Sequence, residues 1–443
     1  MSRQGAALLA ALVIGLAACS SDASPSAQPS LPPRSDNVEL VASLPRAEHS
    51  FEFAHTDLAF WGELLVQGSY DGFRLVDISD PASPELLAEV ACRGPQGDVS
   101  IWEDLVFVSV DRPQSSPACD SQDAARADPL FLPDDGGWEG VRVFNISSPA
   151  RPELVASVAT DCGSLAHTLV PDEARNRVLL YVTSFATELE PRLAPGCVNP
   201  HGHISVVEVP LGDPEAARVV SRPHLFDTPA LPVPPGAPPN VHPSVGCEDV
   251  AVNLALRLAA AACRSEGQVW DLSNLERPMA IAHVDDPSVG VWSSAAWSGD
   301  GSLVAFGDAS PADACADGGA LLLYSVTDPR APEAVGRFSP PRTPGGGECS
   351  AGLAAGVPGT DLLTAAWLSG GASLLDVSDP ANPREVAWYD AEGDPSGDAW
   401  AAYWYRGHLY VSDRQRGLEV VSVDEPALAG AAALDRLNPQ TTE

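Results

Sequence analysis

The stretch Gly72–Pro81, GFRLVDISDP, returns in nearly the same form as GASLLDVSDP from Gly371. Aligning the chain on this phrase gives seven copies: GFRLVDIS (72–79), GVRVFNIS (140–147), HISVVEVP (203–210), GQVWDLS (267–273), ALLLYSVT (320–327), ASLLDVS (372–378) and GLEVVSV (417–423). Each copy is rich in β-branched and aliphatic residues, which favour strands, and Asp-Pro cannot continue a strand ladder. The phrase therefore predicts a strand that ends at a turn and is reused along the chain.

Further short strands are expected on both sides of each copy. Most copies are followed by a Pro-containing turn and another apolar stretch, as in DPASPELLAEV from Asp80. Two apolar segments precede most copies, for example DVSIW and LVFVSV before Gly140. Four-stranded units repeated seven times describe a β-propeller, in which each blade packs against its neighbours around a channel. A solenoid would have shorter and more regular units.

The start of the repeat region offers an independent check on ring closure. The sequence VELVASL at Val38–Leu44 nearly copies PELVASV at Pro152–Val158, which is an expected fourth strand. The seventh unit has no convincing fourth strand of its own, because DEPALAGAAAL resembles a turn into a short helix. Val38–Leu44 is therefore expected to complete the last blade and leave no open sheet edge. The resulting prediction is an all-β, seven-bladed β-propeller over residues 38–430, followed by a C-terminal tail over 431–443.

The N-terminal residues have the pattern of an export signal. A cation at Arg3 precedes a short apolar run, and LAAC ends at Cys19. The run is too short for a transmembrane helix and is typical of a cleaved signal. Residues 1–19 resemble a lipoprotein signal with a lipobox that makes Cys19 the lipidated residue; the alternative is an ordinary secretory signal. The Ser/Pro-rich residues 20–37 are expected to be a linker, and the protein to be lipid-anchored on the outer face of a bacterial membrane or secreted.

The cysteines fit an oxidising compartment. Of nine cysteines, Cys19 is assigned to the lipid and eight remain. They occur as four successive couples, each separated by a loop-like stretch, and neighbour pairing is therefore expected: Cys92 with Cys119, Cys162 with Cys197, Cys247 with Cys263, and Cys315 with Cys349. None of the couples has the spacing of a zinc knuckle or a redox motif. Structural disulfides are the interpretation that this pattern favours.

The charge of the chain limits its partners. The formal net charge is −35 and the sequence contains no lysine. Nucleic acid is a poor partner for such a chain, because binding phosphates needs clustered cations. An anionic bilayer surface would also repel it, so that membrane contact is expected only through the lipid anchor. We expect a monomer whose partner is an extracellular protein, peptide or glycan.

The repeated phrases also carry a family resemblance. LVDISDP, with its echoes VFNISSP and LLDVSDP, resembles the LVIVD repeat of surface and secreted bacterial proteins. Longer segments, such as AYWYRGHLYVSDRQRGLEV, resemble an exported lipoprotein branch of that family. The resemblance implies a propeller fold and export but no established reaction. It also implies that the first strands of relatives carry more histidines, at positions that are occupied in this chain by Glu248, Ser293 and Gly352.

Candidate site residues lie near the starts of the expected first strands, which line the channel and meet at one mouth of the ring. They are His55, His167, Glu248, Asp249, Ser293, Asp398 and Trp400. No cofactor is certain, but His167, Glu248 and Asp249 could hold a divalent metal, and the oxygen ligands favour a hard ion such as calcium. The alternative is that these side chains hydrogen-bond the neighbouring blade.

Three classes of function follow from this pattern. The first is a binding or scaffolding module that engages a protein, peptide or glycan at the channel mouth, which the absence of a catalytic motif favours. The second is a metal-dependent extracellular hydrolase or lyase with Glu248 as general base on a bound water. The third is a structural envelope protein. Whether the chain is an enzyme is therefore open at this point, and the residues favour binding over catalysis.

Overall fold

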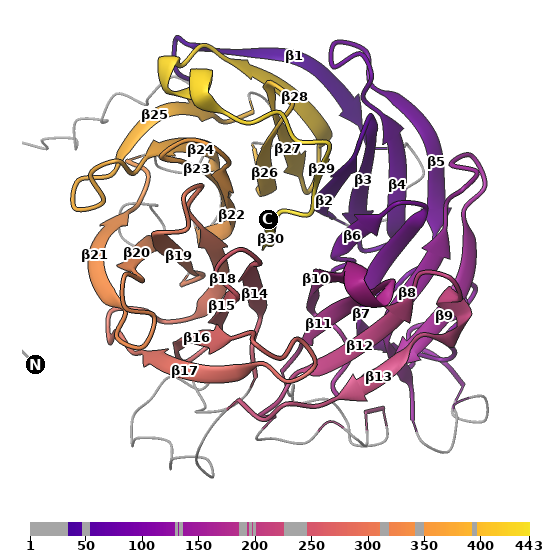
Figure 1. Cartoon of the computed structure of the whole chain (residues 1–443). Coiled ribbons are helices and arrows are strands. Elements are labelled where there is room, and N and C mark those ends of the chain that lie inside the picture. Colours follow the sequence, from indigo (N-terminus) through magenta and orange to yellow (C-terminus); the bar gives the residue numbers. More distant parts are fainter. Residues whose placement is uncertain are drawn as a thin grey trace, which may run out of the picture. The chain divides into compact units, whose positions relative to one another are not determined.

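The described strands form seven sheets that follow one another around a central axis (Figure 1). The computed structural model describes residues 34–46, 54–128, 132, 136–185, 193–194, 197, 201–225, 246–310, 319–341, 350–391 and 397–443. The predicted signal residues 1–19, Cys19 and most of the predicted linker lie outside these ranges. Within these ranges, no helix has the length and apolar character that crossing a membrane requires.

The first four blades each contain four consecutive strands. Blade 1 consists of β2 (His55–Trp61), β3 (Leu64–Ser69), β4 (Gly72–Asp77) and β5 (Glu85–Ala91). Blade 2 consists of β6 (Val99–Trp102), β7 (Leu105–Gln114), β8 (Trp138–Asn145) and β9 (Glu153–Ala159). Blade 3 consists of β10 (Ala166–Asp172), β11 (Arg177–Thr183), β12 (Ser205–Pro210) and β13 (Arg218–Ser221). Blade 4 consists of β14 (Asp249–Asn253), β15 (Leu258–Ala262), β16 (Gly267–Asp271) and β17 (Met279–Val284).

The last three blades complete the ring. Blade 5 consists of β18 (Trp292–Trp297), β19 (Leu303–Asp308), β20 (Leu321–Ser325) and β21 (Glu333–Phe338). Blade 6 consists of β22 (Ser350–Val357), β23 (Leu362–Leu368), β24 (Gly371–Asp376) and β25 (Arg384–Tyr389). Blade 7 consists of β26 (Ala399–Tyr405), β27 (His408–Asp413), β28 (Gly417–Val423) and β1 (Val38–Pro45). The 3-10 helices η2 (Glu173–Arg175), η3 (Pro214–Ala216) and η4 (Pro426–Gly430) lie in connections. The predicted seven-bladed propeller is confirmed, and every repeated phrase lies in a third strand.

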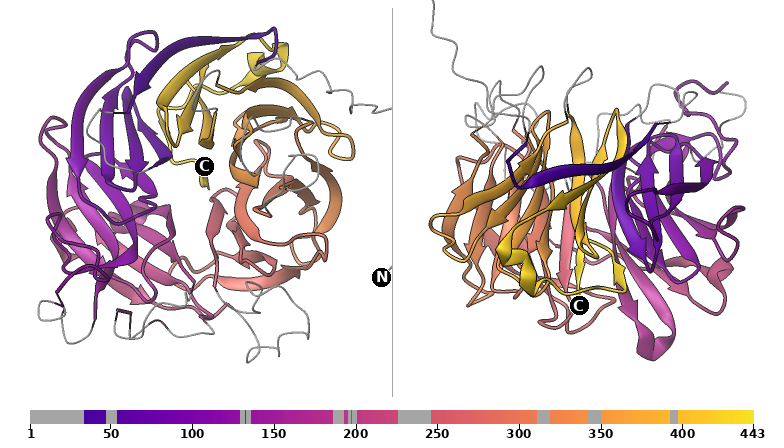
Figure 2. Two further views of the ribbon diagram at one scale, coloured as in Figure 1. Left: turned by 180° about the vertical axis from the view of Figure 1, so that it is seen from behind. Right: turned by 90° about the horizontal axis from the view of Figure 1, so that it is seen from above.

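The predicted closure is also confirmed. Strand β1 pairs antiparallel with β28, and Figure 2 shows it in indigo alongside the yellow strands of blade 7. Its register jumps between Leu40 and Ala42, as that of β9 jumps at the corresponding Val155. Buried Arg74 of β4 secures the end of β1 by donating a hydrogen bond of 2.9 Å to the carbonyl of Pro45. Closure therefore rests on strand pairing within blade 7 and on a contact from blade 1.

Hydrophobic clusters fill the spaces between adjacent blades. One joins blades 1 and 2 and includes Phe73 and Phe144, whose rings meet edge to face with centroids 4.9 Å apart. Another closes the ring between blades 7 and 1 and includes Phe60 stacked on Tyr405. Comparable clusters lie between the other neighbouring blades. Each blade thus buries both faces, which explains why single blades are not stable alone and the repeats must form a ring.

The structure gives a physical reason for two residues of the repeated phrase, its glycine and its first aspartate. Gly72 begins β4 with φ of +141°, and a Cβ there would lie 2.0 Å from the carbonyl oxygen of Val90 on the neighbouring strand. Asp77 ends β4, and its carboxylate accepts a hydrogen bond of 2.8 Å from the backbone of Ser79. The glycine therefore permits close approach of the fourth strand, and the aspartate stabilises the turn that leads to it.

Disulfides tie loops to the blades. The predicted pairs Cys92–Cys119, Cys162–Cys197 and Cys247–Cys263 are confirmed. The predicted Cys315–Cys349 pair lies outside the described residues. Three disulfides are consistent with an exported protein that folds in an oxidising compartment.

Residues after 430 cross the middle of the ring rather than forming a free tail. Strand β29 (Arg436–Leu437) pairs with β2 of blade 1, and β30 (Thr441–Thr442) pairs with β14 of blade 4. Between them, Asn438 exchanges two hydrogen bonds with the backbone of Ile101 in blade 2, at 2.8 and 2.9 Å. The C-terminus lies at the centre of the ring in Figure 1. The C-terminal tail over 431–443 thus contacts several blades and spans the channel.

Candidate functional site

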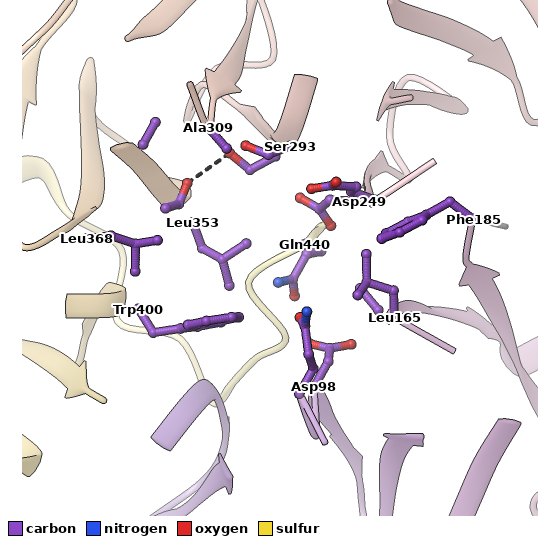
Figure 3. A pocket seen from close by; sticks show the side chains of 16 residues that line it. Asp98, Leu165, Phe185, Asp249, Ser293, Ala309, Leu353, Leu368, Trp400 and Gln440 are labelled. Carbon is purple, nitrogen blue, oxygen red and sulfur yellow. Dashed lines mark hydrogen bonds between the residues drawn. The ribbon is translucent and has the colours of Figure 1, made fainter. Parts of the chain in front are cut away.

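The starts of the first strands surround a cavity of about 180 Å³ at one mouth of the ring. Its lining includes the predicted residues Glu248, Asp249, Ser293 and Trp400 (Figure 3). Asp249, Ser293 and Trp400 belong to strands β14, β18 and β26, and Glu248 immediately precedes β14. The expectation that first-strand starts converge at one mouth therefore holds for four of the candidates. We call this cavity the mouth pocket.

The C-terminal segment forms the floor of the mouth pocket. Gln440 lines the pocket, and its side-chain amide donates a hydrogen bond of 3.0 Å to the carboxylate of Asp57 in blade 1. Its carbonyl accepts a hydrogen bond of 2.7 Å from Val252 in blade 4. A separate cavity of about 100 Å³ is lined by first-strand ends and by Pro439 and Glu443. The segment thus lies between the two cavities, lining the first with Gln440 and the second with Pro439 and Glu443.

Three carboxyl groups, those of Asp98, Glu248 and Asp249, line the mouth pocket. Burial, together with the charges of Asp98 and Glu248, raises the pKa of Asp249 to about 7. The backbone amides of Val250 and Ala295 oppose this shift by donating to Asp249 at 2.8 and 2.9 Å. These contacts hold Asp249 in position while leaving its charge poorly compensated.

Two further carboxyl groups extend this cluster. Burial raises the pKa of Glu248 to about 7, although an ion pair with Arg264 favours its charged form. Below the floor, burial and the neighbouring charge of Asp98 raise the pKa of Asp57 well above its ordinary value. Asp57 accepts a hydrogen bond of 2.6 Å from the hydroxyl of Tyr403. Burial thus favours the protonated forms of these carboxyl groups, and Asp249 is held by neutral backbone amides, whereas Glu248 has Arg264 as a partner.

The walls of the mouth pocket are mainly apolar. Phe185, Leu353 and Trp400 point into it from different parts of the ring (Figure 3). The guanidinium of Arg264 lies 4.2 Å from the ring centre of Phe185, and that of Arg414 lies 5.6 Å from the ring centre of Trp400. These cation–π contacts hold both aromatic rings in place.

His167 does not face the pocket. Its ring is buried between blades 2 and 3, where its Nε2 lies 2.7 Å from the hydroxyl of Ser100 and its Nδ1 lies 2.8 Å from that of Ser109. Nδ1 also lies 3.2 Å from the carboxylate of Asp98. Both ring nitrogens therefore have protein groups as hydrogen-bond partners. This agrees with the alternative interpretation, in which these candidate side chains hydrogen-bond the neighbouring blade.

The predicted metal triad is not assembled. Within the described ranges, histidine, cysteine, aspartate and glutamate side chains form no group of three that could hold a metal ion. His167 is turned into the wall, and Glu248 is engaged by Arg264. The expectation of His167, Glu248 and Asp249 as joint ligands is thus corrected, because the ring orientation of His167 serves the contact between blades.

The remaining two candidates lie beside the mouth but outside the pocket lining. His55 is 2% exposed, and burial together with the charge of Arg74 lowers its pKa to about 3. Asp398 accepts a hydrogen bond of 3.2 Å from the backbone of Ser369 and lies 3.5 Å from the guanidinium of Arg414. Asp398 therefore contacts Arg414, whose guanidinium lies against Trp400 of the pocket lining.

Sequence reasoning missed several residues of the site. Asp98 stands directly before the apolar run VSIW, just as Asp249 stands directly before VAV. Alignment of the first strands could therefore have identified Asp98 as a site residue. Phe185 follows a second strand and Gln440 belongs to the C-terminal segment, and neither position is marked by the repeat. Only the three-dimensional path of the chain brings them to the pocket.

Comparisons with known proteins support the fold. The LVIVD repeat model matches residues 68–91, so the chain carries an LVIVD repeat there. The crystal structure of Saccharomyces cerevisiae Sqt1 aligns with a TM-score of 0.51 and 10% identity, covering 86% of this chain and 98% of that one. Sqt1 from Chaetomium thermophilum aligns with a TM-score of 0.48 and 13% identity over 82% and 80% of the two chains. No curated protein sequence matches. At 10% identity the likeness to the Saccharomyces cerevisiae structure concerns the fold alone.

Proposed function

We propose that this LVIVD-repeat propeller is a binding module whose mouth pocket receives a basic side chain from a protein or peptide partner. The observation that carries the proposal is the mixed lining of the mouth pocket, in which mainly apolar walls stand beside three carboxyl groups. A lysine or arginine side chain has the matching combination of groups, an apolar stem and a cationic end.

The size of the pocket supports a single side chain as the ligand. A volume of about 180 Å³ is below the 300–1,000 Å³ that is typical of drug-sized ligand pockets. An extended oligosaccharide would have to lie mainly outside it. A glycan partner is therefore less well matched than a protein or peptide that projects one residue inward.

Electrostatics supports a cationic ligand. Glu248 and Asp249 have pKa values raised to about 7, mainly because burial disfavours their charged forms. Arg264 partly compensates the charge of Glu248, whereas the hydrogen bonds to Asp249 come from neutral backbone amides. A cation entering the pocket would favour the charged forms and lower both pKa values. Ligand binding is thus linked to proton release from these carboxyl groups, and the affinity should rise with pH.

The proposal includes an extracellular setting. An exported lipoprotein, anchored through Cys19 by the linker at residues 20–37, would present the propeller to partners outside the cell. The disulfides support such a setting, since they persist in oxidising compartments.

Titration with small probes tests the proposed ligand class. N-acetyl-lysine methylamide should bind about tenfold to a hundredfold more tightly than the neutral N-acetyl-norleucine methylamide, because a charged hydrogen bond contributes about 1.5–3 kcal/mol. Glu248→Gln should weaken binding of the lysine probe, whereas Glu333→Gln, at an exposed position on the outer strand β21, serves as the matched control. Equal affinity for the two probes would contradict the proposal.

A further inference from the structure

A second cavity lies beside the mouth pocket and has the opposite charge. It has a volume of about 210 Å³ and is lined by Arg93, Arg112 and Arg126. The segment between Arg93 and Asp98 separates the two cavities, because its first residues line this one and its last residues line the mouth pocket. In a chain with 60 acidic and 25 basic residues, three arginines around one cavity run against the overall composition.

The cavity is held by a rigid frame. Buried Arg142 of β8 donates hydrogen bonds to the carbonyls of Cys92, Arg93, Pro117 and Ala118 and lies 3.3 Å from the hydroxyl of Ser121. The Cys92–Cys119 disulfide joins the same two segments. The backbone of Ser115 donates to the carbonyl of Gln122 at 2.7 Å. The loop that carries Arg126 is therefore fastened to blade 2 before any ligand arrives, which reduces the entropic cost of binding.

A buried acceptor in the cavity lining lacks a donor. Gln114 is 1% exposed, and its side-chain nitrogen donates a hydrogen bond of 2.9 Å to the carbonyl of Arg112. The remaining atom, Oε1, has no hydrogen-bond partner among the described residues. Buried acceptors are normally paired. The present packing covers this oxygen, so a ligand that brings an N–H or O–H group would complete it once the Gln114 side chain turns toward the cavity.

The charge balance of the cavity suits a monoanion. Three lining arginines, set against the carboxylates of Asp123 and of Asp71, the partner of Arg93, leave a net charge of +1. Arg112 pairs with Asp123 at 3.6 Å and Arg93 pairs with Asp71 at 3.3 Å, but both arginine side chains remain about half exposed, so these pairs are weak. The guanidinium fork fits a carboxylate with two parallel hydrogen bonds. A dianion such as phosphate would meet more repulsion from Asp123.

We propose that this arginine cavity binds a carboxylate that has an N–H donor next to it, the chemistry of a peptide C-terminus. The arginines would take the carboxylate, and Gln114 Oε1 would accept the adjacent N–H. The site uses none of the side chains that line the mouth pocket and goes beyond the function proposed above. A partner could occupy both cavities, since one short segment of chain separates them.

Ligand-observed NMR titration of the full chain tests this assignment. N-acetylglycine carries the carboxylate and the N–H, N-acetylglycinamide lacks the charge, and N-acetylsarcosine lacks the N–H. N-acetylglycine should bind at least about fivefold more tightly than either analogue. Arg126→Gln and Arg112→Gln should each weaken it to a similar extent, and both positions are exposed, so that the fold should be retained. Arg151→Gln, at an exposed turn of the same blade, is the matched control.

The possible results separate this proposal from that for the mouth pocket. Equal binding of N-acetylglycinamide, or unchanged affinity in both arginine variants, would overturn the arginine site. Binding of glucuronate in place of N-acetylglycine would overturn the peptide assignment in favour of an acidic glycan. Binding of N-acetyl-lysine methylamide should be unaffected by Arg126→Gln, so failure of one site is recognised independently of the other.

Discussion

Replacing Asp249 by asparagine should change how the stability of the propeller depends on pH. The pKa of Asp249 is raised from 3.8 to about 7, mainly by burial. A carboxyl group with a raised folded-state pKa contributes stability that is fully present below its unfolded pKa and is lost as pH rises through the folded value. At 1.36 kcal/mol for each pKa unit, this loss amounts to about 3 kcal/mol between pH 5 and pH 8.

The variant should lack this dependence but have a constant cost of its own. One amide oxygen cannot accept from both Val250 and Ala295, and an unpaired buried N–H costs about 1–3 kcal/mol. In guanidinium titrations, Asp249→Asn should therefore be less stable than the wild type at pH 5, and the deficit should close by about 3 kcal/mol by pH 8. Asp328→Asn, at an exposed outer turn, is the control. A difference between wild type and Asp249→Asn that stays constant with pH would refute the reasoning.

Three other perturbations test separate parts of the structure. Replacing Cys247 and Cys263 by serine should lower the unfolding free energy by about 3 kcal/mol, since the pair closes a loop with a sequence separation of 16; calorimetry of oxidised and reduced protein checks this. Truncation after residue 435 should abolish binding of the lysine probe in calorimetric titration, because it removes the floor of the mouth pocket, and retained affinity would count against that role. Deletion through residue 46 should expose the edge of β28 and cause self-association in size-exclusion chromatography, whereas a stable monomer would mean that the ring does not need β1.

The repeat made the fold predictable from the sequence. Seven similar phrases reveal the third strands directly, and the copy of PELVASV at Val38–Leu44 reveals the closing strand. The similarity of the two fourth strands extends to their register jumps, at Val155 and Val41. The residue types at these positions do not by themselves indicate a bulge. The repeat works as a predictor because each blade must present the same surfaces to its neighbours.

The site was less predictable because its residues do not obey the repeat. First-strand alignment correctly brings Glu248 and Asp249 to one mouth, but it cannot indicate which way a side chain turns. His167 has the expected place in the chain, yet Ser100 and Ser109 hold its ring in the wall between two blades. Gln440 reaches the pocket only because the chain returns across the channel after its last blade. Such features depend on contacts between distant segments.

The most direct test of the central claim is the affinity for N-acetyl-lysine methylamide, measured by calorimetry at pH 6 and pH 8. The ammonium group is charged at both values, whereas Glu248 and Asp249 pass through their pKa values of about 7 in this interval. If binding requires one of these carboxyl groups to lose its proton, affinity should increase by about tenfold from pH 6 to pH 8. Affinity that is unchanged or weaker at pH 8 would contradict a mouth pocket that binds cations through its carboxylates.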